Sequence, residues 1–187
     1  LDVRAGATVT VPATANPPSE LNVYGLASFT GTLANPVRLL GGARDWAATT
    51  ERIGAMPGGK ITASYVTLNS TLSALNTGVV VADHVTASGA YTGFFTSGQI
   101  YTPGGTIAVR DSVLSNGAWI NLNGGYLLID RTTLDNAQVY TGRYRGGHTI
   151  YFNNIVARNH PDSCFHLTGY DHFFGPNNVI QGNGFPV

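Results

Sequence analysis

The chain has 187 residues, of which 43% are apolar and only 11% are charged. This charged fraction lies well below the roughly 25% typical of soluble domains, and the 24 glycines favour β-structure with many tight turns. Ten basic residues balance ten acidic ones, so nothing builds the positive field that a nucleic-acid-binding protein needs. No run of about eighteen apolar residues predicts a membrane span. The single cysteine, Cys164, excludes an internal disulfide framework.

The first sixty residues predict β-strands at irregular spacing. Residues 1–11 carry three valines around a Gly-Ala turn, and residues 21–25 and 36–40 predict strands of two further coils. Residues 47–54 predict either a short helix or an excursion from the coil. The Pro-Gly-Gly sequence at 57–59 then returns the chain to a clearer pattern.

From residue 64 onward the sequence carries a degenerate repeat. Each unit has a short polar residue, then a β-branched pair or near-pair, then Asn or Ser five or six positions on. The units begin at Ser64, Asp83, Asp111, Asp130, Asn153 and Asn177. These starts lie 19, 28, 19, 23 and 24 residues apart, an average of about 23. A solenoid coil of three short strands and three turns needs roughly that many residues.

Apolar segments lie before and after the polar part of each unit. Those before it are Val79–Val81, Ile107–Val109, Leu127–Ile129 and Ile150–Phe152. Those after the Asn are Tyr91–Phe95, Trp119–Leu122, Val139–Tyr140 and Cys164–Leu167, in which Cys164 is predicted to be a buried small residue. Because no single coil can bury its apolar face, the pattern predicts an all-β protein, a parallel β-helix of about seven or eight coils.

The recurring asparagines have a physical reason. A sharp corner between strands often needs a left-handed backbone conformation, which Asn tolerates better than most residues. Stacked about 4.8 Å apart, their side-chain amides can also bond to one another as a ladder. The predicted structural ladder consists of Asn69, Asn116, Asn136, Asn159 and Asn183, with Ser88 replacing Asn in one coil.

Two features of the sequence resemble known β-helical proteins. The run 1–11, followed by residues 23–25 and 30–32, resembles the β-helix regions of large bacterial surface proteins. The alternation of strand, Asn-Asn corner and Gly-rich turn resembles the right-handed parallel β-helix repeats of the pectin-lyase-like superfamily. This resemblance covers most of the chain and implies a right-handed β-helix. It implies little about function, because the superfamily hosts lyases, hydrolases, epimerases, phage tailspikes and passive surface rods.

The first candidate for chemistry is a column of aspartates. Asp83, Asp111 and Asp130 begin three successive units and are predicted to stack at one corner. Carboxylates brought close together raise one another's pKa or hold a cation, so the column could serve catalysis or metal binding. Arg110 and Arg131 flank it and could neutralise a uronate or pair with the aspartates. The alternative is that short polar residues simply suit the corner.

The enzyme signatures of the superfamily are missing. Asp83-His84 lacks the Trp-containing pattern that surrounds a similar pair in pectate lyases, and Gly146-Gly147-His148 does not match the Gly-His-Gly element of the hydrolases. The adjacent aspartate pair of the hydrolases is also absent. The sequence therefore leans away from an enzyme, and we predict no cofactor.

Two further clusters of side chains lie between residues 140 and 172. Four histidines lie between residues 148 and 172, namely His148, His160, His166 and His172, but their spacing follows neither a helix face nor a strand, so we predict no metal site. The aromatic and basic residues Tyr140, Arg143, Tyr144 and Arg145 surround one loop. Exposed tyrosines stack on sugar rings or enter protein contacts, and arginines pair with carboxylates, so these four residues predict a binding surface for a glycan or a protein.

The sequence as a whole predicts one β-helix domain over residues 1–187, from a mature product or a piece of a longer protein, since it begins at Leu1. The expected function is an extracellular structural or adhesive module of a surface protein, fibre or phage spike. Two alternatives stay open. One is a small lyase or hydrolase acting on an acidic glycan at the aspartate column. The other is a head-to-tail filament subunit, since the chain stops at residue 187 within a coil.

Overall fold

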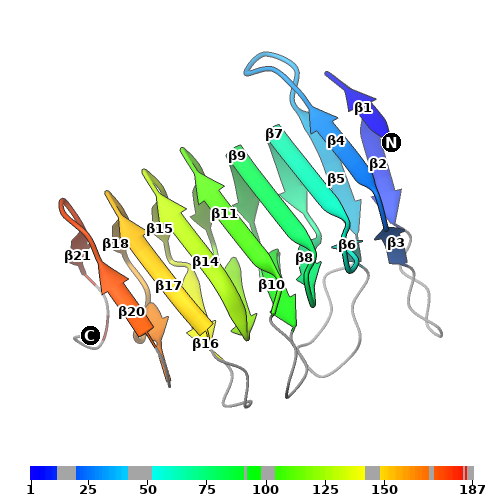
Figure 1. Ribbon diagram of the computed structural model, residues 1–187. Coiled ribbons are helices and arrows are strands. Elements are labelled where there is room, and N and C mark those ends of the chain that lie inside the picture. The colour runs from blue at the N-terminus through cyan, green and yellow to red at the C-terminus, as the bar shows by residue number, and fades with distance from the viewer. Residues whose placement is uncertain are drawn as a thin grey trace.

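The structure, a computed structural model, describes residues 1–11, 20–41, 52–90, 92–97, 104–141, 148–168, 171–182 and 184. These residues form 21 β-strands and no helix, and all strand pairs are parallel. Accordingly, no helix long and apolar enough to cross a membrane occurs in this part of the chain. Figure 1 shows the strands stacked in chain order, from β1 at one end of a rod to β20 and β21 at the other. The predicted all-β parallel solenoid is confirmed.

The first face of the solenoid is a ladder of strands that open each turn. It contains β1 (Asp2–Arg4), β4 (Leu26–Thr30), the first half of β7 (Lys60–Asn69), the first half of β9 (Val79–Ser88), β11 (Thr106–Arg110), β14 (Gly125–Asp130), β17 (His148–Asn153) and β20 (Asp171–Phe174).

The second face follows the first after a sharp corner. It contains β2 (Thr8–Val11), β5 (Val37–Gly41), the second halves of β7 and β9, β12 (Val113–Ser115), β15 (Thr133–Asp135), β18 (Val156–Arg158) and β21 (Val179–Gln181). The third face is a separate sheet of β3 (Glu20–Val23), β6 (Arg52–Ala55), β8 (Thr71–Leu75), β10 (Gly93–Ser97), β13 (Trp119–Asn123), β16 (Gln138–Thr141) and β19 (Phe165–His166).

Six turns, which begin with β4, β7, β9, β11, β14 and β17, have a neighbouring turn on both sides. The windings of β1 and β20 have a described neighbour on one side only. The solenoid therefore has about six enclosed turns, with one further winding at each end, where seven or eight coils were predicted.

The core consists of columns of inward side chains, one column for each alternate strand position. On the second face the buried column is Leu39, Leu68, Ala87, Leu114, Leu134 and Ala157. Large and small residues compensate within a turn. Ala82 and Ala87 point inward from β9, and Phe94 of β10 lies fully buried in the same turn. The interior is thus filled by combining volumes across faces, as dense packing requires.

The first corner, between the first and second faces, has a left-handed backbone in six turns. Its residues are Tyr65, His84, Asp111, Arg131, Asn154 and Asn177, with φ between 45° and 60°. Left-handed conformations are uncommon outside glycine and asparagine. Four residue types here are neither of these, and they adopt the conformation because every turn must bend at the same place. Asp111 therefore sits on a bend and does not point into the core.

The second corner, between the second and third faces, has the predicted conformation. Asn116, Asn136 and Asn159 have φ values of 54°, 53° and 60°. Each lies one residue beyond the ladder of β12, β15 and β18, so the three stack in register. These φ values confirm the prediction that asparagine occurs here because the corner needs a left-handed backbone conformation.

The third corner depends on a column of glycines. One position in register at this corner is glycine in five turns, at Gly25, Gly59, Gly78, Gly105 and Gly125. The first four directly precede a first-face strand, and Gly125 is the first residue of β14. A Cβ atom at Gly78 would lie 2.0 Å from the carbonyl oxygen of Ala55 in the preceding turn. Neighbouring backbones approach this closely only because the side chain is a hydrogen atom.

We predict that Gly78→Ala destabilises the fold by about 3 kcal/mol, because the new methyl group must displace backbone. Gly25→Ala is the matched control, since it belongs to the same column and a Cβ there meets nothing within 4 Å. Its unfolding free energy should stay within about 1 kcal/mol of wild type. Urea unfolding of both variants measures this, and equal losses would contradict the close approach.

Candidate functional site

The predicted column of three aspartates is wrong in register. The ladder of the first face pairs Asp83 with Arg110, and Arg110 with Asp130. Asp111 lies one residue later, in the first-corner column with His84 and Arg131. The physical reason is that the turn between β9 and β11 is one residue shorter than the spacing of the aspartates. A strand-end column and a corner column therefore lie side by side along the first corner.

Arg131 joins two turns at this corner. Its Nε and one terminal NH₂ group donate to the two carboxylate oxygens of Asp111, each at 2.7 Å. Its other terminal nitrogen contacts the carboxylate of Asp130. Two parallel hydrogen bonds to one carboxylate make the strongest geometry available to an arginine–aspartate pair.

Polar contacts continue along the corner on both sides of Arg131. Towards the C-terminus, the Asn154 amide donates to Asp130 at 2.9 Å, and Asn177 donates to Asn154 at 3.1 Å. Towards the N-terminus, His84 Nδ1 lies 3.1 Å from the carboxylate of Asp83. The ring of Tyr65 stacks on His84, with centroids 4.5 Å apart. Polar contacts thus run continuously from Asp111 to Asn177. The side chains of Asp83, His84 and Tyr65 extend this polar ladder along the corner without a hydrogen bond to Asp111 among the described residues.

The electrostatics of this ladder disfavour acid–base catalysis by Asp111. The hydrogen bonds from Arg131 hold the pKa of Asp111 below its usual 3.8, outweighing the opposing effect of desolvation. The carboxylate in turn raises the pKa of Arg131. Asp111 is therefore ionised at neutral pH, and both of its oxygens already accept hydrogen bonds.

Ligand atoms of Asp83, His84 and Asp111 lie within 4.8 Å of one another. Carboxylate and imidazole are ligands for divalent metals, so this is the closest approach to a metal centre in the part of the chain that the structure describes. A metal would compete with the Arg131 guanidinium for the same Asp111 oxygens. The side chains satisfy one another without it.

We predict that Arg131→Met raises the pKa of Asp111 to its ordinary value of 3.8 or above, because the variant removes the donor and leaves Asp83 and Asp130 nearby. In wild type, the contribution of the ionised Asp111 carboxylate to the stability of the fold is complete above pH 3.8. This contribution is lost as the pH falls through the lower pKa that Asp111 has in the folded state. Carboxyl-carbon NMR titration measures the value. An unchanged Asp111 pKa in the variant would show that Arg131 does not control it.

The predicted asparagine ladder at the second corner holds only in part. Asn116 donates to Ser88 at 3.0 Å, and Asn159 donates to Asp135 at 2.8 Å, so the amides bond to the neighbouring column and not to one another. Asn69 ends β7 and falls in the register of Ser88, one position before the corner. Asn183 lies outside the described residues.

Asp135 plays the same role at the second corner that Asp111 plays at the first. The amide of Asn159 and then Arg158 lower the pKa of Asp135. Arg158 donates to this carboxylate at 3.0 Å and 3.1 Å from the following turn. Both corners therefore use a carboxylate of one turn to bind an arginine of the next.

Of the four clustered histidines, only His148 and His172 contact each other. The Nε2 atoms of His148 and His172 are 3.1 Å apart, and their rings stack with centroids 5.3 Å apart. His166 contacts the amide of Gln138, and His160 Nδ1 accepts from the backbone of Asp162. In the ranges described, no three of them bring ligand atoms together.

We predict a pH-dependent stability from His148. Burial, and then the neighbouring His172, lower the pKa of His148 below its usual 6.5, so the unfolded chain binds more protons between these values. Stability is therefore complete above pH 6.5 and declines as the pH falls through the folded-state pKa. In thermal unfolding at pH 7.5 and 5, His148→Phe should reduce the decrease seen in wild type. Identical decreases in thermal stability for wild type and His148→Phe would show that His148 is not the source of the pH dependence.

The predicted binding cluster is only partly described. Arg143, Tyr144 and Arg145 lie outside the described residues. Tyr140 is exposed on the third face, with its ring tilted against His166 at a centroid distance of 6.2 Å. The structure therefore places one of the four residues on an accessible surface.

An outward apolar column on the first face escaped the sequence analysis. The ladder aligns Val81, Ala108, Leu128, Tyr151 and Phe173, which we call the first-face stripe. Tyr151 and Phe173 are 43% and 47% exposed, and their rings stack 4.9 Å apart. The signal was present in the sequence, since each residue lies within a short apolar segment, but the strand register was needed to show that the five residues align.

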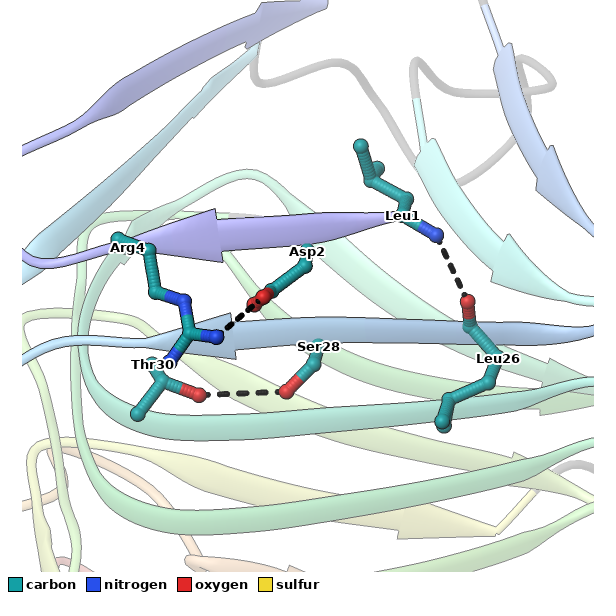
Figure 2. Close-up of a pocket in the computed structure, with 6 residues that line it drawn as sticks. All are labelled: Leu1, Asp2, Arg4, Leu26, Ser28 and Thr30. Carbon is teal, nitrogen blue, oxygen red and sulfur yellow. Dashed lines mark hydrogen bonds and ion pairs between the residues drawn. The ribbon is translucent and has the colours of Figure 1, made fainter.

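A shallow hollow of about 400 Å³ lies at the N-terminal end of the first face. Figure 2 shows its polar groups bonded to one another: Arg4 with Asp2 at 2.6 Å, and Ser28 with Thr30 at 3.2 Å. None of the candidate residues named above lines it; its walls are Leu1, Asp2, Arg4, Leu26, Ser28 and Thr30. With its charges paired internally, it offers little to a charged ligand.

The comparisons with known proteins give no further guide. Family models, curated proteins and solved structures were all searched, and none matches the chain. The parallel β-solenoid therefore stands on the strand pairing itself, and any function must be argued from the geometry.

Proposed function

We propose that the chain is a structural or adhesive module of an extracellular surface protein, fibre or spike, whose repeated turns form a stiff rod. The observation that supports this most directly is the use of charge at the corners. Arg131 bridges Asp111 and Asp130, and Arg158 bridges to Asp135 of the previous turn. Side chains that bind successive turns together serve the rod itself.

A glycan-cleaving enzyme of this kind needs a different arrangement. Its two carboxyl groups take separate roles, one protonated and one ionised, because their environments push the two pKa values apart. The pKa of Asp111 is lowered, and its two oxygens face a guanidinium rather than open solvent. A hydrolase at this corner therefore has little support. A lyase needs a general base in place of the carboxyl pair, and Asp111 is poorly suited to that role because both of its oxygens already accept hydrogen bonds from Arg131.

The first-face stripe supports the adhesive part of the proposal. Tyr151 and Phe173 are exposed side chains with stacked rings, and Leu128 continues the apolar surface in the preceding turn. Exposed aromatic side chains on a rigid sheet are suited to contacts with sugars or with another protein. A face built from stacked strands holds such side chains at fixed spacing without any loop closure.

An assay on acidic polysaccharides separates the proposal from the enzyme alternative. We expect neither new reducing ends nor unsaturated products from wild type, and the same result from Asp111→Ala. Thr67→Ala, an exposed position on the second face, serves as the matched control for folding. Turnover by wild type and the control that is lost in Asp111→Ala would overturn the structural assignment.

A further inference from the structure

Asn69 is the first residue of the sequence Asn69-Ser70-Thr71, the one Asn-x-Ser/Thr tripeptide without proline at x in the chain. This tripeptide is the acceptor signal for N-linked glycans in secreted proteins. Asn69 ends β7 at the edge of the second corner, where its side chain is exposed. The signal therefore falls on an accessible asparagine.

The Asn69 amide is also unengaged, unlike comparable amides of the same corner. Asn116 and Asn159 each donate to a neighbouring turn, whereas within the described ranges no hydrogen bond involves the Asn69 side chain. Its neighbour in the next turn, Ser88, is small and exposed. A substituent on the Asn69 amide would break no cross-turn bond and would project into solvent.

The other two residues of the signal are hidden in the fold. Ser70 and Thr71 are only 2% and 4% exposed, and Ser70 packs so closely on Gly41 that a Cβ there would lie 2.6 Å from its Oγ. Recognition of the tripeptide requires the hydroxyl of Thr71, which is accessible only while β7 and β8 are unfolded. The folded solenoid thus presents the amide but hides the hydroxyl.

We propose that Asn69 carries one N-linked oligosaccharide, added before the turn of β7 and β8 closes. The proposal rests on the extracellular location given above. In the reaction, Nδ2 of Asn69 bonds to the anomeric carbon of a lipid-diphosphate-linked oligosaccharide. The carbon–oxygen bond to the diphosphate breaks, the lipid diphosphate leaves with the electron pair, and the amide loses one proton. No oxidant or reductant is involved.

Expression of the full chain behind a signal peptide in a eukaryotic secretory cell tests the site. Intact-mass analysis of both retained and secreted chain should show one glycan, removed by N-glycosidase with aspartate left at position 69. Asn69→Gln and Thr71→Val should lose the glycan completely, whereas Ser70→Ala and the matched control Asn116→Gln should keep it. An unmodified wild-type chain in both fractions would overturn the site, and would leave the polysaccharide assay of the proposed function untouched.

The order of events has its own test. Oligosaccharyltransferase and a lipid-linked oligosaccharide are supplied to unglycosylated chain, either folded or denatured in urea and then diluted. We expect modification of the denatured chain and a yield at least about tenfold lower from the folded chain. The reason is that only the small fraction of folded chains in which β7 and β8 are transiently unfolded exposes the hydroxyl of Thr71. Equal yields would contradict modification before folding.

Discussion

Backbone hydrogen bonding between successive parallel turns is the constraint on which the rest of the structure depends. Every strand of the six enclosed turns except β19, which pairs with β16 alone, pairs with a strand of the turn above and a strand of the turn below. A bend or a close approach in one turn must therefore recur in the next. The side chains then stack in columns about 4.8 Å apart. Column membership, rather than sequence motif, decides which residues meet.

This constraint explains both the unusual corners and their chemistry. Tyr65 and His84 adopt a left-handed backbone, which is unfavourable for such residues, because the ladder on either side fixes the bend. The same stacking places Asp111 and Arg131 in one column, one turn apart, so opposite charges lie next to each other along the corner and neutralise one another. In a polar ladder of this kind the side chains bind one another. A catalytic site would need the same side chains to be available to a substrate.

The fold was predictable from sequence because its signal is spread over many residues. Apolar triplets such as Leu127–Ile129, followed by a polar residue and later by asparagine, recur often enough to show the coil despite variable loops. Register was not predictable, because Asp83 and Asp111 look equivalent in sequence while the ladder pairs Asp83 with Arg110. The glycine column was not predicted, because the need for glycine at these positions depends on a neighbouring carbonyl that only the stacked structure supplies. The predicted aspartate column was wrong because Asp111 lies one residue out of register with Asp83.

The most direct test of the account is the stacking register in solution, measured by backbone nuclear Overhauser effects between strands. The account predicts contacts from Leu114 to Ala87 on one side and to Leu134 on the other, together with contacts between Asp83 and Arg110. Contacts pairing Asp83 with Asp111, or a pattern typical of antiparallel strands around Leu114, would contradict it.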